Sequence, residues 1–383
     1  MTSIEPSDGT IPRAQAVDVR EAWRGRGVGV ELEFFVVDRE TLRPRDHLDL
    51  LLDGMPPGSV KPEIAREHVE VVTPPVASLG ALEDHARILV EAAGTLLADV
   101  GAVLLPLALH DGTGFTLTDL PRYRRLIEVF GPPFWENAST ILADQVNLGA
   151  DDEDQAFRIF RAVRAHLPLF MGLSAASPFV KGAANGIASN RMYRYDACTV
   201  RHPGLGGVPP DLRSMAEYRG HLERQPVLPH PNMFYRYVRP MPQRGVAAEI
   251  RCIDKQPTLG DFLALTALSR AVAAEALAIR TATDAPHPDP GSDRSPPGER
   301  LAADFRRARD RGVLDREGWS RRLDALAGHL PLDERSYLEP LRRSLETGPP
   351  AVRLAAAAER RGMRSVLREL VEGYLADPLR AVA

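Results

Sequence analysis

Short runs of mainly apolar side chains, bounded by glycine, proline or polar residues, predict β-strands along the first two thirds of the chain. The clearest run, VGVELEFFVV at residues 28–37, is rich in β-branched and aromatic residues and lies between Gly27 and Asp38. Runs of the same kind predict further strands at residues 69–73, 103–107, 141–148 and 246–253. These strands are spaced widely enough to leave room for helices between them.

Apolar residues at spacings of three and four predict those helices. They are expected at residues 78–100, 123–130, 154–173 and 258–279. The last begins at Thr258, with Asp261 three residues later in a variant of the capping box. Strands and helices therefore alternate, irregularly, up to about residue 280.

The chain divides into four parts by the same patterns. Residues 1–24 have no sustained periodicity and are expected to form a flexible N-terminal arm. Residues 25–280 form the main domain. Residues 281–299 are rich in proline and predict a loop, and residues 300–383 repeat Leu and Ala at helical spacing, which predicts a helical part packed on the main domain.

The composition excludes several classes of function. With 383 residues, of which 44% are hydrophobic, the chain can bury a large core. Its formal net charge of -4 gives no basic excess for binding nucleic acid. No stretch approaches the roughly 20 apolar residues of a membrane helix, and the start of the chain does not resemble a signal peptide, so a cytoplasmic location is expected. Cys198 and Cys252 are too few for a disulfide framework and are expected to be plain thiols.

Candidate chemistry lies on one face of the predicted strands. Side chains two residues apart on a strand share a face, so Glu31 and Glu33 point away from the apolar Val30 and Leu32. The polar positions selected in this way from four strands are Glu31, Glu33, Glu70, Gln145, Asn147, Glu249 and Arg251. If the strands form one sheet, the carboxyl groups crowd together, and their repulsion requires a cation among them.

The residue types on that face predict a hard divalent cation. Carboxylate and amide oxygens without a cluster of His or Cys favour Mg²⁺ or Mn²⁺ over zinc, and such ions assist phosphoryl transfer from a nucleotide. A solvated face of an antiparallel sheet is the alternative. Such a face usually carries Lys and Thr as well, whereas Arg251 is the only basic residue among these positions.

The sequence has no GxxxxGK[ST] run and no GxGxxG run after a strand, which excludes a P-loop and a dinucleotide fold. Phosphates would then be held by metals and by arginines, because a guanidinium can bind phosphate or carboxylate through two parallel hydrogen bonds. The candidates are Arg191, Arg236, Arg239 and Arg251. A lone histidine is more often a packed side chain than a catalyst, so His68 and His110 are left out of the site.

With these residues in place, the sequence resembles the glutamate–cysteine ligase family of the second, plant and bacterial carboxylate–amine ligase type. The matching runs occur in family order over about residues 27–280. They are GVELEFFVV at 29–37, VEVVTPP at 69–75, DQVNLG at 144–149, SAASPF at 174–179, NGIASNR at 185–191 and RPMPQRGVAAEIRCID at 239–254. The resemblance implies an α+β, glutamine-synthetase-like fold, in which the concave face of an antiparallel sheet forms the active site and helices cover the other face.

The resemblance also implies roles for individual residues. Those that match the family's metal ligands are Glu31, Glu33, Glu70 and Glu249. Glu63 resembles a further ligand, with Glu67 as its less favoured substitute. Gln145 matches a position in the metal site that is His in some members. Arg191, Asn147 and Arg239 are expected to bind substrate. Arg251 and Arg236 are expected to contact the nucleotide, and Arg251 and Glu249 to be catalytic.

The implied activity is that of an ATP-dependent, ADP-forming carbon–nitrogen ligase that uses Mg²⁺ or Mn²⁺. It would form a γ-glutamyl amide through an acyl phosphate, as glutamate–cysteine ligases do. Another amino acid or amine as acceptor, a non-catalytic relative that only binds nucleotide and metal, and a metal-dependent phosphohydrolase remain alternatives. The partners expected are small-molecule substrates rather than nucleic acid or membrane, and a homo-oligomer is left open.

Overall fold

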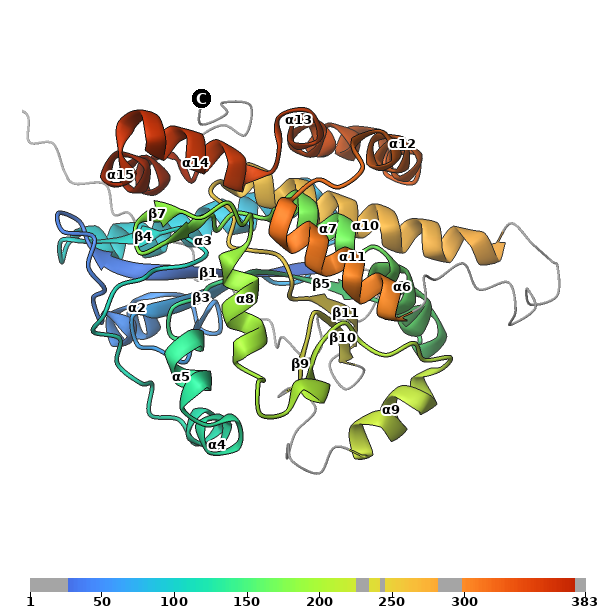
Figure 1. Cartoon of the computed structure of the whole chain (residues 1–383), viewed down its shortest axis with the longest axis horizontal. Coiled ribbons are helices and arrows are strands. Elements are labelled where there is room, and N and C mark those ends of the chain that lie inside the picture. Colours follow the sequence, from blue (N-terminus) through green and yellow to red (C-terminus); the bar gives the residue numbers. More distant parts are fainter. Residues whose placement is uncertain (1–26, 225–233, 242–244, 282–297, 376–383) are drawn as a thin grey trace, which may run out of the picture.

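The three-dimensional structure, a computed structural model, describes residues 27–224, 234–241, 245–281 and 298–375. A sheet runs through the middle of the molecule with helices around it (Figure 1). The predicted N-terminal arm and nearly all of the predicted Pro-rich loop lie outside the described residues. No helix within these ranges is both long enough and apolar enough to cross a membrane.

The central sheet has seven strands, all antiparallel, in the order β10-β11-β5-β1-β3-β2, with β4 paired to the far end of β1. Their bounds are β1 Val28–Asp38, β2 Val60–Pro62, β3 His68–Val72, β4 Ala102–Leu105, β5 Asp144–Gly149, β10 Val238–Met241 and β11 Val246–Ile250. All five predicted strands are present, although β5 begins later and β11 ends earlier than their hydrophobic runs suggested. The sequence did not predict β2 and β10.

Two short pairs of strands lie outside this sheet. They are β6 (Phe179–Val180) with β7 (Ala183–Ala184), which are antiparallel, and β8 (Gly206–Gly207) with β9 (Tyr235–Arg236), which are parallel. The helices up to residue 281 are α2 Leu48–Gly54, α3 Leu79–Ala98, α4 Pro121–Phe130, α5 Pro132–Ala138, α6 Glu153–Ala165, α7 Leu167–Ser174, α8 Asn190–Ala197, α9 Met215–Glu223 and α10 Leu259–Thr281. The later helices are α11 Gly298–Arg311, α12 Arg316–Ala327, α13 Glu339–Thr347, α14 Pro350–Arg361 and α15 Met363–Gly373, with a 3-10 helix at Leu332–Leu338.

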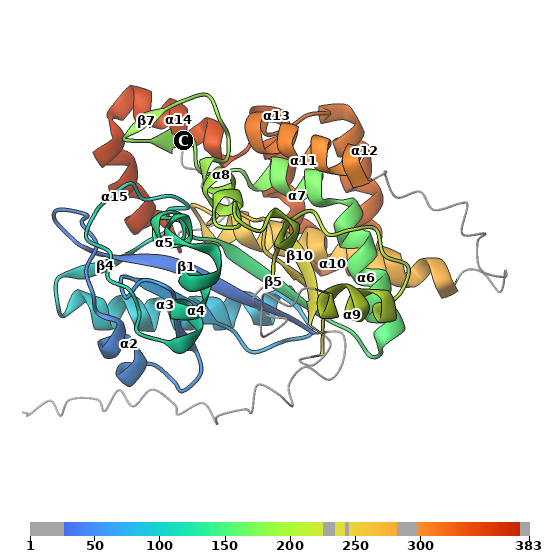
Figure 2. The ribbon, with the colours of Figure 1, turned by 60° about the horizontal axis from the view of Figure 1, so that its bottom comes forward.

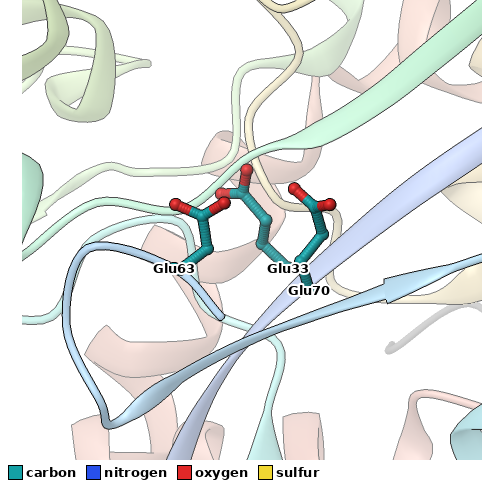
Figure 3. Close-up of side chains that lie close together, drawn as sticks. All are labelled: Glu33, Glu63 and Glu70. Atoms are coloured by element: carbon teal, nitrogen blue, oxygen red, sulfur yellow. The ribbon is translucent and has the colours of Figure 1, made fainter. Parts of the chain in front are cut away.

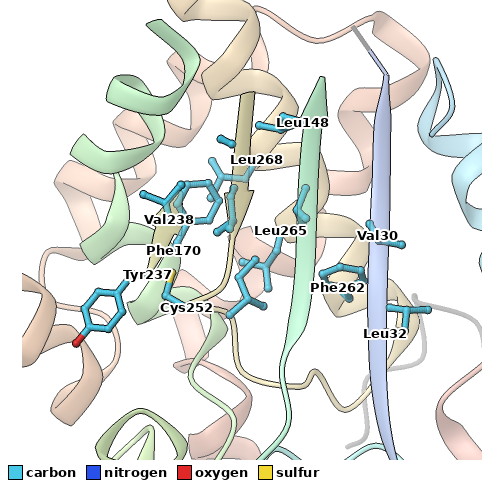
Figure 4. Close-up of a cluster of buried hydrophobic side chains, with 14 of the residues drawn as sticks. Val30, Leu32, Leu148, Phe170, Tyr237, Val238, Cys252, Phe262, Leu265 and Leu268 are labelled. Carbon is cyan, nitrogen blue, oxygen red and sulfur yellow. The ribbon is translucent and has the colours of Figure 1, made fainter. Parts of the chain in front are cut away.

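One face of the sheet packs on helices and forms the main core. Phe262 of α10 lies beside Val30 and Leu32 of β1, Leu265 of α10 lies nearer to β5, and all four side chains are fully buried or nearly so (Figure 4). Burying a side chain of this size contributes about 1.5–3 kcal/mol. The even-numbered positions of β1 are therefore committed to the core, which leaves its odd-numbered positions facing the other way.

The start of α10 confirms the predicted cap. The backbone N–H of Asp261 donates to the Thr258 hydroxyl oxygen at 3.0 Å, and the hydroxyl donates back to the Asp261 carboxylate at 3.0 Å. This satisfies a backbone donor that the first turn of a helix otherwise leaves without a partner.

The predicted single helix at residues 154–173 is wrong. The structure has two helices, α6 and α7, separated at His166, whose backbone leaves the helical region with φ −98° and ψ 5°. Pro168 explains the break, because proline has no N–H to donate to the carbonyl four residues earlier and its ring clashes with that carbonyl, whereas the first turn of α7 tolerates it.

The C-terminal helices α12 to α15 lie together on one side of the molecule in both views (Figure 2). Two of them, α14 and α15, also pack on part of the second face of the sheet. Phe35 and Val37 of β1 point to the same side as Glu31 and Glu33, yet they are buried in a separate hydrophobic cluster with residues of α14 and α15 such as Leu354. The second face is thus apolar at one end and polar at the other.

Candidate functional site

The pairing of the strands brings the predicted polar positions to one face. Glu33 of β1 stands directly opposite Glu70 of β3, and Glu31 stands opposite Gln145 of β5. On the other side of β5, Asn147 stands opposite Glu249 of β11. Directly opposed residues on antiparallel strands have Cβ atoms about 4.5–5.5 Å apart, so these side chains form one continuous polar area.

Three carboxylates form the centre of this area. One oxygen from each of Glu33, Glu63 and Glu70 lies within 4.8 Å of the other two (Figure 3). Glu63 follows β2, and of the two candidates near this position it is Glu63 rather than Glu67 that joins the group. Glu67 is turned away and accepts a hydrogen bond from the backbone N–H of Thr116 at 2.8 Å.

The three carboxylates are held in an unfavourable arrangement. Burial raises the pKa of Glu63 well above its usual range, and the negative charges of Glu70 and Glu33 raise it further. The pKa of Glu33 is also raised, chiefly by burial. A divalent cation would relieve this repulsion, and an all-oxygen group of donors fits Mg²⁺ or Mn²⁺. The residues present therefore fit the predicted kind of ion.

Lys61 is a member of the site that the sequence analysis missed. It projects from β2, and its Nζ lies 2.9 Å from Glu70 Oε1 and 3.2 Å from Glu31 Oε1. Burial and the charge of Glu70 raise the pKa of Glu31 to about 7, while the charge of Lys61 opposes that rise. The strand β2 has only three residues and ends in Pro62, so it offered no alternation from which its polar face could be predicted.

Gln145 links the carboxylates to Arg251. Its Nε2 donates to Glu33 Oε1 at 2.6 Å, and its Oε1 accepts from Arg251 Nη1 at 2.6 Å. Arg251 Nη1 also donates to Glu249 Oε1 at 3.1 Å. Both polar ends of the Gln145 amide are thus engaged by protein groups, in positions that hold Glu33 and Arg251 on either side of it.

Glu249 lies outside the group of three carboxylates. Arg239 binds it in a forked ion pair, with Nη2 at 3.1 Å from Oε1 and Nε bonded to Oε2. The remaining Nη1 of Arg239 donates to the backbone carbonyl of Phe234 at 3.0 Å. The predicted roles of Glu249 as a metal ligand and of Arg239 as a substrate-binding residue remain predictions, and in this structure the two side chains neutralise each other.

Arg236 is engaged with the backbone of a neighbouring loop. Its Nη1 donates to the carbonyls of Gly206 at 2.5 Å and Val208 at 3.1 Å, and its Nη2 donates to that of Gly204. These bonds hold residues 204–208 against β9. The predicted contact between Arg236 and the nucleotide remains a prediction.

Arg191 and Asn147 each have a buried polar atom with no hydrogen-bond partner among the described residues. The atoms are Arg191 Nε and Asn147 Oδ1, in side chains that are each 3% exposed. Arg191 Nη1 donates to the backbone carbonyl of Arg251 at 3.1 Å, and its guanidinium lies 5.0 Å from the centre of the Tyr195 ring. A buried polar atom without a partner is costly, and a bound ligand is one explanation for it.

Asp254 connects two of the sequence runs that resemble the family, SAASPF and NGIASNR, to the site. Its carboxylate accepts hydrogen bonds from the hydroxyls of Ser177 at 2.7 Å and Ser189 at 2.9 Å, and from the backbone N–H of Ala176 at 2.9 Å. The Ser177 hydroxyl in turn accepts from the backbone N–H of Arg191 at 2.9 Å. The runs SAASPF and NGIASNR are therefore tied to the residues after β11, and this fixes the start of α8 and Arg191.

His68, His110 and the two cysteines lie outside the polar area. His68 packs edge-on against Phe35, with ring centres 5.0 Å apart, and burial lowers its pKa to about 3, so it is neutral. His110 also packs against Phe35, and burial lowers its pKa as well. Cys198 and Cys252 are buried free thiols whose pKa values are raised to about 12 by burial.

Comparison with known sequences identifies relatives over most of the chain. The chain is 31% identical over 253 residues to a protein of Clavibacter michiganensis named "Putative glutamate–cysteine ligase 2", in a match covering 63% of this chain and 64% of that protein. It is 32% identical over 266 residues to "Putative glutamate–cysteine ligase 2-3" of Rubrobacter xylanophilus, covering 65% of this chain and 69% of that protein. The first of these matches thus spans somewhat less than two thirds of its relative.

Solved structures confirm the predicted fold. A bifunctional glutathione synthetase from Pasteurella multocida superposes with a TM-score of 0.69 at 16% identity, covering 94% of this chain and 54% of that chain. A glutamate–cysteine ligase from Francisella tularensis, solved in complex with AMP, gives a TM-score of 0.64 at 14% identity, covering 92% and 89%. The chain therefore has the predicted α+β, glutamine-synthetase-like fold, with an antiparallel sheet and a helical C-terminal part.

The family assignment follows from the extent of the sequence match as well as from this fold. The profile of the family described as "Glutamate-cysteine ligase family 2 (GCS2)" matches residues 27–372, which is nearly all of the part that the structure describes. The resemblance that the sequence runs indicated is thereby confirmed, and the chain belongs to glutamate-cysteine ligase family 2.

Proposed function

We propose that this protein is an ATP-dependent, ADP-forming ligase that joins the side-chain carboxylate of a glutamate-like substrate to an amine. The observation that carries the proposal is the group of Glu33, Glu63 and Glu70, of which Glu33 and Glu70 are buried and Glu63 is partly buried. This group shares one face of the sheet with Arg251, and Arg191, whose buried Nε has no hydrogen-bond partner among the described residues, contributes a positive charge near Glu33. This combination of anionic oxygens and guanidinium groups suits a reaction between a nucleotide phosphate and a carboxylate.

The residues that would hold a divalent cation are Glu33, Glu63 and Glu70, with Glu31, Glu249 and Gln145 as the further ligands that family resemblance suggests. Mg²⁺ or Mn²⁺ bound there would screen the repulsion between phosphate and carboxylate and would stabilise charge on the transferring phosphoryl group. The bond from Gln145 to Glu33 and the bond from the backbone N–H of Ala143 to Glu33, both 2.6 Å long, would keep this carboxylate in position.

The reaction we propose has two steps. A carboxylate oxygen of the substrate attacks the γ-phosphorus of ATP, the bond to the β-phosphate oxygen breaks, and ADP leaves. The amine nitrogen then attacks the acyl carbon, inorganic phosphate leaves with the electrons of the C–O bond, and the nitrogen loses a proton. Arg251 would contact the phosphate, and Arg191 would bind a carboxylate of the substrate through its Nε and the rest of its guanidinium.

The acyl phosphate would have to be protected from water. The cluster formed by Phe35, Val37 and the helices α14 and α15 is buried and apolar, and it adjoins the polar half of the same face. This supports the view that the C-terminal helices close one end of the site. Among the acceptors, an amino acid such as cysteine is the one suggested by the names of the relatives, with another amino acid or amine as the alternative.

The proposal is tested by measuring ADP release from MgATP in the presence of glutamate and a panel of amino acids and amines. Release that requires both glutamate and one acceptor is the expected result, and the acceptor then identifies the product. Hydrolysis of ATP that is indifferent to both compounds would contradict ligase activity, and binding of nucleotide without any turnover would favour a non-catalytic relative.

A further inference from the structure

The ammonium group of Lys61 lies where a cation is needed between two carboxylates. Lys61 stands directly opposite Glu70 in the pairing of β2 with β3, and its Nζ contacts both Glu70 and Glu31, at 2.9 Å and 3.2 Å. The side chains of Glu70 and Glu31 are only 6% and 11% exposed. The charge on Lys61 is therefore the nearest compensation for Glu31, which does not belong to the group of three carboxylates.

The choice of lysine at this position is informative because the chain hardly uses lysine. Only three of its 48 basic residues are lysines, namely Lys61, Lys181 and Lys255. An ammonium is a compact, nearly spherical charge, whereas a guanidinium is planar and binds carboxylates side-on. A compact charge fits between two carboxylates in the same way as a metal ion does, which a guanidinium does less well.

Lys61 lies at the edge of the sheet, where its side chain is not part of the hydrophobic core. It lies on the edge strand β2, and its side chain is 38% exposed, so it reaches into the site from the border. A lysine ammonium is charged at neutral pH, and its contacts with the carboxylates of Glu70 and Glu31, at 2.9 Å and 3.2 Å, favour that charge. It therefore supplies one permanent positive charge to the carboxylates of the site.

We propose that Lys61 is a built-in cation that takes the place of a second divalent ion. In the absence of nucleotide, the described carboxylates would bind one divalent cation at Glu33, Glu63 and Glu70, while the ammonium of Lys61 occupies the position between Glu31 and Glu70. This inference rests on the metal site of the proposed function, and it adds that the number of ions bound is limited by a side chain of the protein itself.

The number of bound ions is measured by titrating the purified full-length protein, free of nucleotide, with Mn²⁺ and following the electron paramagnetic resonance signal of the free ion. The wild-type protein is expected to bind one Mn²⁺ per chain. Lys61→Met, which removes the charge and shortens the unbranched side chain by one atom, is expected to bind two. An unchanged number in a folded Lys61→Met protein would overturn the proposal, and so would two ions in the wild type.

Further variants identify the position of the added ion. In the double variant Lys61→Met with Glu31→Gln, the count should return to one, because the second position has lost a charged ligand; a count of two there would overturn the proposal. Lys181→Met is the matched control, since Lys181 is exposed and belongs to no ion pair among the described residues, and it should leave the count at one.

The outcomes separate this inference from the proposed function. If none of the proteins binds Mn²⁺, the metal site itself is wrong and the proposed function fails with it. If the wild type binds two ions, the metal site stands and only the role of Lys61 is refuted. Thermal unfolding of each variant checks that it is folded. If Lys61→Met does not fold, the number of Mn²⁺ ions bound by the wild type still tests the proposal, because two ions would refute it and one would support it.

Discussion

Replacing Asp254 tests whether the hydrogen bonds behind the site stabilise the protein and position Arg191. It is completely buried and accepts three hydrogen bonds, from Ser177, Ser189 and the backbone of Ala176. Replacing it by alanine leaves three donors without their acceptor and opens a small cavity. Since hydrogen bonds to a charged group contribute about 1.5–3 kcal/mol each and the surroundings relax in part, we expect Asp254→Ala to lower the free energy of unfolding by about 3–5 kcal/mol.

A second effect is expected at Arg191. Ser177 both donates to Asp254 and accepts from the backbone N–H of Arg191, so the loss of Asp254 releases the start of α8. Arg191 would then be less well positioned to bind a substrate carboxylate, and the KM for that substrate should rise about tenfold or more while kcat changes less. This is the pattern expected of a positioning residue.

Urea unfolding followed by tryptophan fluorescence measures the first effect, and steady-state assays of ADP release measure the second. Ser177→Ala removes one of the three donors and also the acceptor of the Arg191 backbone N–H, so it should cost about 2 kcal/mol, less than Asp254→Ala. A free energy of unfolding for Asp254→Ala within 1 kcal/mol of the wild type would refute the hydrogen-bond reasoning. A destabilised variant with an unchanged KM would refute the link to Arg191.

Three further predictions concern the carboxylates and the helix cap. Glu70→Gln removes one charge from the group of three carboxylates, and we expect the affinity for Mn²⁺ to fall about 100-fold in the same resonance titration, with a smaller fall contradicting its place in the site. In the metal-free protein the pKa of Glu31 is about 7 in the folded state and 4.5 in the unfolded state. Between these pH values the folded state therefore binds more protons than the unfolded state. The free energy of unfolding should fall as the pH rises from about 4.5 to 7. The fall due to Glu31 is about 3 kcal/mol and can be measured by urea unfolding at several pH values. Glu31→Gln should make the free energy of unfolding depend less steeply on pH. An equally steep dependence in that variant would assign the effect to other groups. Thr258→Ala removes the cap of α10 and should cost about 1 kcal/mol in urea, whereas a neutral result would mean that packing alone holds the start of this helix.

Much of the sheet and of the site could be predicted from local sequence. The run at 28–37 was sufficient to predict β1, and the alternation around Glu31 and Glu33 assigned both carboxylates to the face opposite the core, as the structure shows. The cap at Thr258 is similarly local, since the two partners are three residues apart. A local signal was also available for the break between α6 and α7, where Pro168 indicates the boundary that the prediction passed over.

Other features of the site could not be predicted in this way. Nothing within β2 indicates that Lys61 will lie between Glu31 and Glu70, because one partner is 30 residues distant and the strand is too short to show a pattern. The ion pair of Glu249 with Arg239 depends on the pairing of β10 with β11, and β10 was not predicted. The hydrophobic cluster that includes Phe35 and residues of α14 and α15 likewise depends on how the end of the chain returns to the sheet.

The sequence by itself determined which side chains of each long strand point to the core and which point away, and with them the acidic character of one face. Only the tertiary structure decided which of those carboxylates meet one another, which are neutralised by Lys61, Arg239 or Arg251, and where the apolar end of the face begins. The physical reason is that the direction of a side chain follows from the two-residue repeat of its own strand, whereas its neighbours follow from strand order and register, which are set by contacts far apart in the chain.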